Sequence, residues 1–81
     1  QTDISANIHT LFSTTVQHID FAGNMIVLKT INGMAQGVCA ALDSMEWDGV
    51  VGTIAGDDSI FIVARSNAKA VTLTSELKKL L

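Results

Sequence analysis

The sequence predicts an α+β domain built on a four-stranded, mostly antiparallel sheet with helices packed on one face. Apolar residues recur at helical spacing near the start, in the middle and at the end of the chain. Between these segments lie four short runs rich in β-branched residues, which form two pairs, each joined by a glycine-containing turn. The order is therefore α-β-β-α-β-β-α. Packing helices against one side of a single sheet is the simplest two-layer arrangement of these elements.

The first helix is expected between Asp3 and about Phe12, with Asp3 in position to cap it. Its apolar side is formed by Ile4, Ile8, Leu11 and Phe12. A strand from Thr14 to Phe21 follows, because this segment is rich in β-branched residues. Ala22-Gly23-Asn24 has the composition of a tight turn, and the apolar run from Met25 to Leu28 completes a hairpin.

The central helix begins after Asn32-Gly33, where the asparagine side chain can cap it, and ends between residues 44 and 46. Its core side is formed by Met34, Val38, Leu42 and Met45. Strands at Val50–Ala55 and Ser59–Ala64 form a second hairpin around the turn Gly56-Asp57-Asp58. We expect a positive φ at the glycine of this turn.

The closing helix is capped by Ser66 or Asn67. Its core side is formed by Ala70, Leu73, Leu77 and Leu80. Ahead of the acidic turn, Gly52 interrupts a β-branched run. Glycine weakens a strand unless a bulge or a close approach requires it, so Gly52 indicates either contact at a sheet edge or packing against a helix.

The composition favours self-association. The 81 residues fit one domain, and 48% of them are hydrophobic while 16% are charged, against about 25% charged in an ordinary soluble domain. A core of this size is marginal, and Cys39, the only cysteine, allows no disulfide within the chain. We therefore expect a closed homo-oligomer that buries apolar surface between its subunits.

The charge pattern argues against several classes of partner. The net charge is −3, and the five basic residues form no cluster of the kind that displaces counterions from nucleic acid. The longest strictly apolar run, Met25 to Leu28, is too short to cross a bilayer, and no signal-peptide pattern opens the chain, so no membrane partner and a cytoplasmic location are expected. Because the chain begins with Gln1, we expect it to be a fragment of a longer protein.

The acidic turn is the first candidate site. Asp57 and Asp58 are adjacent carboxylates at the tip of a hairpin, and each makes the other harder to ionise unless a cation or a donor is near. They therefore favour a positively charged partner. The alternative is a solvated polar turn, since aspartate is common in turns.

The central helix carries the second candidate site. Gln36 and Asp43 are seven residues apart, so they lie on one face of the helix, two turns from each other. Gly37 and Ala40 between them are small, and a polar face with small residues between its side chains can admit a ligand or another backbone. The alternative is an ordinary solvent-facing strip.

An enzyme is less well supported by the residues. A nucleophile and its base would have to be Cys39 with His9 or His18, but Cys39 falls among core positions and is expected to be a buried, inert thiol. The two histidines show no spacing typical of a metal site, so we expect neither catalytic nor metal-binding residues. The adjacent aspartates alone are a weak signal for Mg²⁺. Trp47 is more typical of a core or interface anchor than of a substrate platform.

One segment is specific enough to indicate a family. Residues 49–58 read Gly-Val-Val-Gly-Thr-Ile-Ala-Gly-Asp-Asp, and this string closely resembles the C-terminal domain of bacterial arginine repressors. The resemblance covers nearly the whole chain. Ile19-Asp20-Phe21, Gly33-x-Ala35-Gln36, Leu42-Asp43-Ser44 and the final helix follow in the family's order.

The resemblance implies that residues 1–81 form an arginine-binding and oligomerisation domain. Domains of this family form trimers, and two trimers stack into a hexamer when the corepressor L-arginine fills sites between them. DNA is then contacted only through an upstream winged helix-turn-helix domain that this chain lacks. No other cofactor is implied.

The family's arginine contacts correspond to six positions of this chain. They are Gln36, Asp43, Asp57 and Asp58, with backbone contacts from Thr53 and Ala55. A guanidinium presents a rigid fork of donors and pairs with carboxylates better than an ammonium does, so selectivity for arginine over lysine is expected.

Two departures from the family are visible. Asn32 stands where the family commonly has proline, and the linker between Asp43 and Gly49 is short, which leaves the placement of Trp47 open. The alternative function is a structural trimerisation module that does not sense arginine, with the acidic turn merely solvated.

Overall fold

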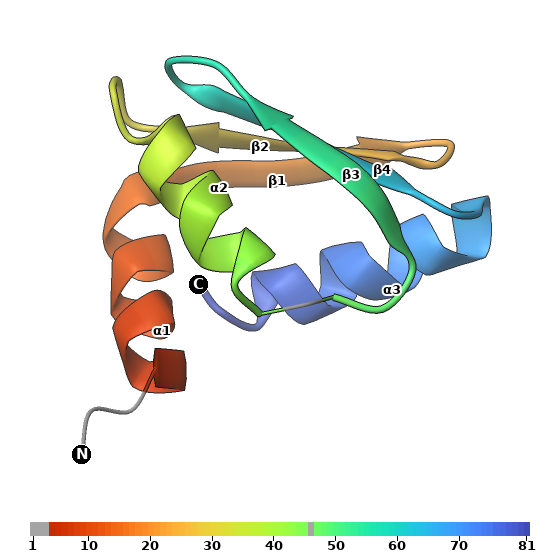
Figure 1. The fold of residues 1–81 in the computed structure, drawn as a ribbon, viewed down its shortest axis with the longest axis horizontal. Helices are drawn as coiled ribbons and strands as arrows, with labels where there is room; N and C mark the ends of the chain where they lie inside the picture. Colours follow the sequence, from red (N-terminus) through yellow and green to blue (C-terminus); the bar gives the residue numbers. More distant parts are fainter. Residues whose placement is uncertain (1–3, 46) are drawn as a thin grey trace.

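The described residues form three helices and four strands in the predicted order (Figure 1). This computed structural model describes residues 4–45 and 47–81, and their side chains from residue 9 onward. The elements are α1 (Ile4–Thr15), β1 (Val16–Ala22), β2 (Met25–Thr30), α2 (Ala35–Asp43), β3 (Val50–Ala55), β4 (Ser59–Ala64) and α3 (Asn67–Lys78). Within these ranges, no helix has the length and apolar character needed to span a membrane.

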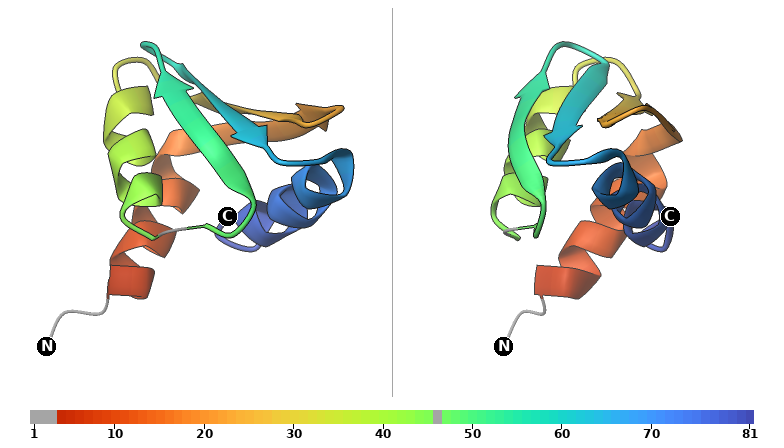
Figure 2. Two further views of the ribbon diagram at one scale, coloured as in Figure 1. Left: turned by 45° about the vertical axis from the view of Figure 1, so that its right-hand side comes forward. Right: turned by 90° about the vertical axis from the view of Figure 1, so that its right-hand side faces the viewer.

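The strands form one antiparallel sheet in the order β1-β2-β4-β3. All three helices lie on the same side of this sheet (Figure 2), so the predicted α+β class and the two-layer arrangement are confirmed. The two predicted hairpins are β1–β2 and β3–β4, and the outer strands β1 and β3 are the edges of the sheet. α2 packs beside β3, which brings the central helix to the edge of the sheet.

The core lies between the sheet and the helices. Its fully buried large side chains are Phe12, Ile26, Leu28, Val38, Leu42, Ile60 and Leu77. The apolar stripes predicted for the central and closing helices face this core, with Met45 and Leu80 packed at its margin, except that Met34 is not among the core residues. Helices on one face therefore bury alternate residues of β2 and β4, and the other residues of these strands point away from the core.

The predicted start of the first strand is wrong, because Thr14 and Thr15 belong to α1. Thr14 donates a hydrogen bond from Oγ1 to the carbonyl oxygen of Thr10 at 2.8 Å, and Thr15 bonds in the same way to Leu11. Such bonds to the preceding turn satisfy the hydroxyl of a β-branched residue within a helix. The predicted cap at Asp3 lies outside the described residues.

The glycine prediction at the acidic turn is also wrong. A positive φ occurs at Gly23 (61°), in the turn of the first hairpin, and at Gly33 (82°) and Gly49 (83°), but not at Gly56. At Gly52, a Cβ atom would meet nothing within 4 Å, so this glycine does not pack against a helix. It lies on the edge strand beside a register shift between Val50 and Gly52, which agrees with a bulge, and the contact at this sheet edge stays a prediction.

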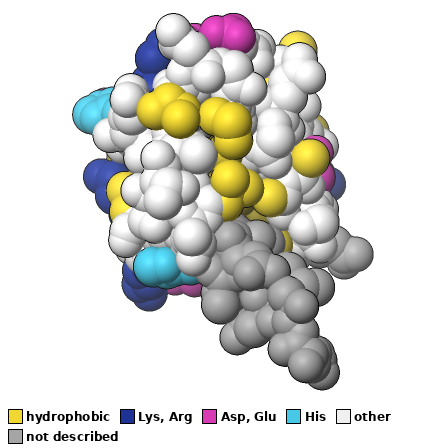
Figure 3. All heavy atoms as spheres, turned by 90° about the vertical axis from the view of Figure 1, so that its left-hand side faces the viewer, with side chains coloured by type: hydrophobic (Ala, Val, Ile, Leu, Met, Phe, Trp, Pro, Cys, Tyr) yellow, Lys and Arg dark blue, Asp and Glu magenta, His cyan; other side chains and the backbone are white. Residues whose placement is uncertain are grey.

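Some apolar side chains stay at the surface. Ile31, in the loop between β2 and α2, is 40% exposed. Seen from the end of the molecule that carries α1 and α2, hydrophobic side chains form a band across the described surface, and an acidic group lies at the top of the view, above the band and apart from it (Figure 3). The single chain thus leaves apolar surface uncovered.

The closing helix begins with the predicted cap. The side chain of Ser66 accepts a hydrogen bond from the backbone N–H of Lys69 at 3.1 Å. Ser66→Ala should therefore lower the free energy of unfolding by about 1 kcal/mol, as measured by urea denaturation. Ser75→Ala, at an exposed position within the same helix, is the matched control and should not destabilise the chain. Equal stability of the Ser66 variant and the unchanged chain would contradict this role.

Candidate functional site

A shallow groove runs between α2 and the β3–β4 hairpin. It consists of two adjoining hollows of about 350 and about 460 Å³ that share Gln36. We call this the α2–β3 groove. Its lining residues are Gly33, Gln36, Cys39, Ala40, Asp43, Thr53, Ile54, Ala55, Gly56 and Asp57.

Five of the six predicted site residues line the α2–β3 groove. Gln36 lies where the two hollows meet, with Asp43, Thr53 and Ala55 in one hollow and Asp57 in the other. These residues come from α2, from β3 and from the turn after β3, so the groove exists only once the central helix has packed against the edge strand. Of the two small residues predicted to leave space on α2, Ala40 lines the groove and Gly37 does not.

Asp58, the sixth predicted residue, does not line the groove. Its carboxylate lies near Lys29 of β2, with Nζ to Oδ2 at 3.7 Å, and accepts a hydrogen bond from the hydroxyl of Ser59 at 3.2 Å. Lys29 also donates to the Ser59 hydroxyl at 2.9 Å. The two carboxylates of the acidic turn are therefore not equivalent in the single chain.

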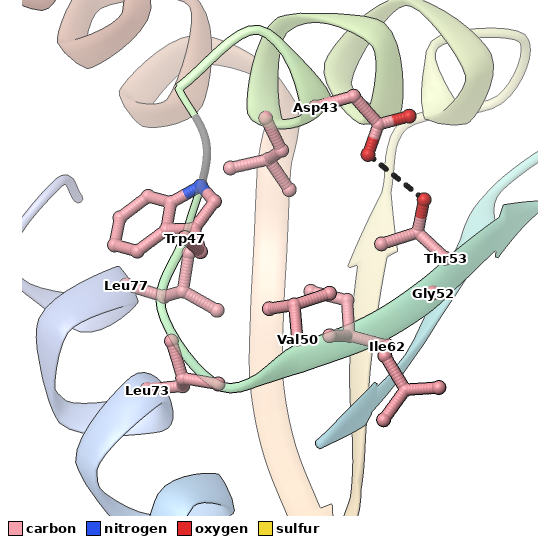
Figure 4. Close-up of a pocket in the computed structure, with 10 residues that line it drawn as sticks. Asp43, Trp47, Val50, Gly52, Thr53, Ile62, Leu73 and Leu77 are labelled. Carbon is pink, nitrogen blue, oxygen red and sulfur yellow. Dashed lines mark hydrogen bonds between the residues drawn. The ribbon is translucent and has the colours of Figure 1, made fainter. Parts of the chain in front are cut away.

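Asp43 is held by a short chain of hydrogen bonds. The Thr53 hydroxyl donates to Asp43 Oδ1 at 2.9 Å (Figure 4), and the Cys39 thiol donates to the Thr53 hydroxyl at 3.3 Å. Cys39 is buried as predicted, but it also lies next to the candidate site. This contact and the one made by Lys29 were not predicted. Both depend on which residues the sheet and helix bring side by side, which spacing along the chain does not reveal.

The acidic turn also fixes the start of α2 through its backbone. The carbonyl oxygen of Asp57 accepts hydrogen bonds from the N–H groups of Gly33 at 3.1 Å and Ala35 at 3.2 Å. Ala35 is the first residue of α2, and its amide is one that a helix start leaves without an intrahelical partner. The predicted cap by Asn32 is wrong, because the N-cap residue is Met34 and no side chain caps it. The turn thus positions α2, and with it the candidate site.

The groove is acidic. Asp43 and Asp57 contribute carboxylates, and no Lys, Arg or His is among its lining residues in the part of the chain that is described. Farther along, Lys69 lowers the pKa of Asp48 by a hydrogen bond of 2.8 Å and by its charge. The Asp48–Lys69 pair joins the loop between α2 and β3 to α3. Among the described residues, neither Asp43 nor Asp57 has a basic side chain paired with it in this way. The arrangement suits a cationic ligand.

Metal coordination finds no support in these residues. Within residues 4–45 and 47–81, no group of three or more His, Cys, Asp or Glu side chains is placed to hold a metal ion. His9 and His18 are both exposed, on α1 and β1.

Comparison with known proteins identifies the family. Residues 12–79 match the family model described as the arginine repressor, C-terminal domain. The chain is 42% identical over 81 residues to the arginine repressor of Caldicellulosiruptor saccharolyticus, covering all of this chain and 53% of that protein. It is 44% identical over 78 residues to that of Alkaliphilus oremlandii, covering 96% of this chain and 52% of that protein.

A third relative is covered over a similar share of its length. The arginine repressor of Clostridium acetobutylicum is 42% identical over 78 residues, with 96% of this chain and 52% of that protein covered. The chain thus spans about half the length of the curated relatives it matches. The chain belongs to the family of arginine repressor C-terminal domains.

Proposed function

We propose that this domain is the L-arginine sensor and oligomerisation module of a transcriptional repressor of arginine metabolism. L-Arginine acts as the corepressor and binds in the α2–β3 groove. Trimers of the domain pair into a hexamer when the groove is filled. DNA is bound by a separate winged helix-turn-helix domain of the full-length protein.

The observation that carries this proposal is an acidic groove with carboxylates in both of its hollows. Asp43 and Asp57 lie in different hollows, with the Gln36 amide where the hollows meet. L-Arginine carries two cationic groups, a guanidinium and an α-ammonium, separated by a flexible stem. A ligand with two separated cations matches two separated carboxylates, and charge-assisted hydrogen bonds are the strong ones. We assign the guanidinium to Asp57, because a planar fork suits an exposed carboxylate at a turn.

The edge strand supports a place for the α-carboxylate of the ligand. β3 pairs with a strand on one side only among the described residues. Alternate N–H groups of an edge strand point outward and lack a ladder partner, so they can donate to an anion. Thr53 and Ala55 line the groove on this strand and are the residues to which we assign these backbone contacts.

The uncovered face of the sheet supports self-association. Register places Val27 and Ile54 beside Phe61, and Met25 beside Val63, all on the face away from the helices. Ile54 is 69% exposed and Phe61 is 42% exposed in the single chain. We call these five residues the apolar sheet face. Covering it with further copies of the chain removes apolar area from water at about 25 cal/mol per Å².

Arginine and assembly are then thermodynamically linked. In the proposed hexamer, facing trimers bring their acidic turns close together. The carboxylates of the two trimers then repel each other when the grooves are empty. A bound cation relieves this repulsion, and any ligand that favours the hexamer is itself bound more tightly by the hexamer.

Light scattering with and without millimolar L-arginine tests this function. We expect the measured mass to double as trimers pair. At about 100 times its Kd, the ligand should also stabilise the chain by about 2.7 kcal/mol, which appears as a higher melting temperature. L-Lysine is the matched control ligand and should have a much smaller effect. If mass and melting temperature both stay unchanged while a responsive family member shifts, the sensing function is wrong.

A second candidate function is a trimerisation module without arginine sensing. The apolar sheet face favours it, because four of its five residues lie outside the α2–β3 groove and Ile54 alone is shared with the groove. The same titration separates the two. A stable trimer that ignores L-arginine would leave this candidate standing.

A further inference from the structure

The Asp43 side chain connects the helix wall of the α2–β3 groove to its strand wall. Asp43 is the last residue of α2, and the hydroxyl of Thr53 on β3 donates to its Oδ1 at 2.9 Å (Figure 4). The same two residues also line a more enclosed cavity of about 420 Å³, whose walls include Leu42, Trp47 and Leu73. The carboxylate turns toward Thr53 and away from Trp47. The hydrogen bond therefore fixes where this carboxylate lies between the two walls of the groove.

The Thr53 hydroxyl is oriented in turn by Cys39. An ionised carboxylate can only accept, so the single proton of the hydroxyl goes to Asp43, and the hydroxyl oxygen accepts from the Cys39 thiol at 3.3 Å. Cys39 is 7% exposed and belongs to the core of the domain. Hydrogen bonds in such a chain polarise and strengthen one another. A buried thiol thus holds the donor that holds the groove carboxylate.

The two carboxylates of the groove differ in what they can offer a ligand. Oδ1 of Asp43 is engaged by Thr53, whereas the Asp57 side chain has no hydrogen bond with the other described residues. A guanidinium uses both oxygens of a carboxylate as a planar fork, but an ammonium is a compact point charge that can pair with one oxygen. Asp57 can therefore take the fork. Asp43 offers one ordered oxygen, Oδ2, which suits the α-ammonium of L-arginine.

We propose that Thr53, supported by Cys39, is a positioning residue that orders Asp43 for the α-ammonium and so fixes the direction in which L-arginine lies in the groove. This inference rests on the proposed function, and it gives the Thr53 side chain a role beside the backbone contact of that residue. Without the hydroxyl, a ligand would have to immobilise the Asp43 side chain as it binds. Ordering one side chain on binding weakens affinity by about 2- to 10-fold.

Calorimetric titration of L-arginine into Thr53 variants of the chain tests the positioning role. Thr53→Val removes the hydroxyl but keeps a β-branched side chain of similar shape, and it should raise the Kd by about 2- to 10-fold. Thr53→Ser keeps the hydroxyl and should restore most of the lost affinity. Equal Kd values for the Val variant and the unchanged chain overturn the proposal, as does a loss in the Ser variant as large as in the Val variant.

A ligand without the α-ammonium separates positioning from a general change in the groove. δ-Guanidinovalerate keeps the guanidinium for Asp57 and the carboxylate but brings no cation to Asp43. Thr53→Val should therefore leave its Kd unchanged while it weakens L-arginine, so the preference for L-arginine over δ-guanidinovalerate should shrink. A merely structural role of Thr53 would weaken both ligands alike, and that result overturns the proposal.

The part played by Cys39 has its own pair of variants. Cys39→Ala removes the thiol donor and should weaken L-arginine in the same selective way, by about twofold, because the Thr53 hydroxyl remains. Cys39→Ser supplies a donor again and should recover the preference for L-arginine. If Cys39→Ala leaves that preference unchanged, Cys39 has no part in positioning.

The order of Asp43 is also measured without any ligand. Scalar couplings to the Asp43 Cγ in NMR spectra should report one rotamer in the unchanged chain and averaging between rotamers in Thr53→Val. A chain that shows this difference but never binds L-arginine would keep the positioning of Asp43 by Thr53 and remove the proposed sensing function. A chain that binds L-arginine while Asp43 is equally ordered in both forms would keep the sensing function and overturn the positioning.

Discussion

Asp57→Asn is expected to abolish the arginine response while keeping the fold. The Asp57 side chain lines the groove and has no hydrogen bond or ion pair with the other described residues, so its carboxylate is open to a guanidinium. Removing one partner of a desolvated charge pair at an interface costs about 2–5 kcal/mol, which weakens binding by about 30-fold or more. Asparagine keeps the backbone carbonyl that accepts from Gly33 and Ala35, so stability without ligand should change little.

Asp58→Asn is the matched comparison. Its carboxylate is already near Lys29 and bonded to Ser59, and both charged side chains of the pair are about half exposed, at 47% and 44%. Such pairs are weak, and a ligand must share Asp58 with a resident cation. Calorimetric titration with L-arginine should show a clearly smaller loss than for Asp57→Asn. Equal losses would contradict the unequal roles of the two carboxylates.

The double variant tests the assignment of the whole turn. Asp57→Ala combined with Asp58→Ala should remove the arginine response and leave the arginine-independent trimer intact, because the apolar sheet face is unchanged. If the trimer is lost as well, the turn contributes to assembly rather than to ligand binding. If the response survives, the ligand does not bind at the turn.

The fold was largely predictable because its signals are local. The apolar stripe of α2 has a period that a helix satisfies, the strand β4 is a short run rich in β-branched residues, and Gly23 lies at a turn that needs a positive φ. The errors fall where a hydrogen bond that the residue pattern does not reveal decides the structure. Thr14 belongs to α1, where its hydroxyl donates to the carbonyl oxygen of Thr10, one helical turn earlier. The start of α2 is fixed by the distant carbonyl of Asp57, which no local pattern around Asn32 could show.

The residues of the candidate site were largely predictable from the sequence, but their arrangement in space was not. Spacing on one helix face put Gln36 and Asp43 together, and the family motif supplied the turn. The sequence could not show that Asp58 turns toward Lys29, since that contact depends on how β2 pairs with β4. It could not show either that Asp43 borders a second cavity, which forms only when α3 closes the space beneath β3.

The apolar sheet face provides the second large prediction, which is that Phe61→Glu dissociates the oligomer. Phe61 lies in the inner strand β4 between Val27 of β2 and Ile54 of β3, so it is central to the face. Burying an unpaired carboxylate at an apolar contact costs several kcal/mol, and we expect self-association to weaken by at least about 100-fold. The single chain should still fold, since Phe61 is already 42% exposed there. Light scattering over a range of concentrations measures association, and circular dichroism checks the fold.

Val71→Glu is the control for the charge itself. Val71 is an apolar residue of α3 that is 51% exposed, and this change adds the same negative charge on the helical side of the molecule. If both variants dissociate alike, the cause is the net charge and not the sheet face. If Phe61→Glu assembles like the unchanged chain, the subunits meet elsewhere. Dissociation of Phe61→Glu alone would place assembly on the apolar sheet face. Because Ile54 belongs both to this face and to the α2–β3 groove, self-association and L-arginine binding would then meet at a shared residue through which they can be linked.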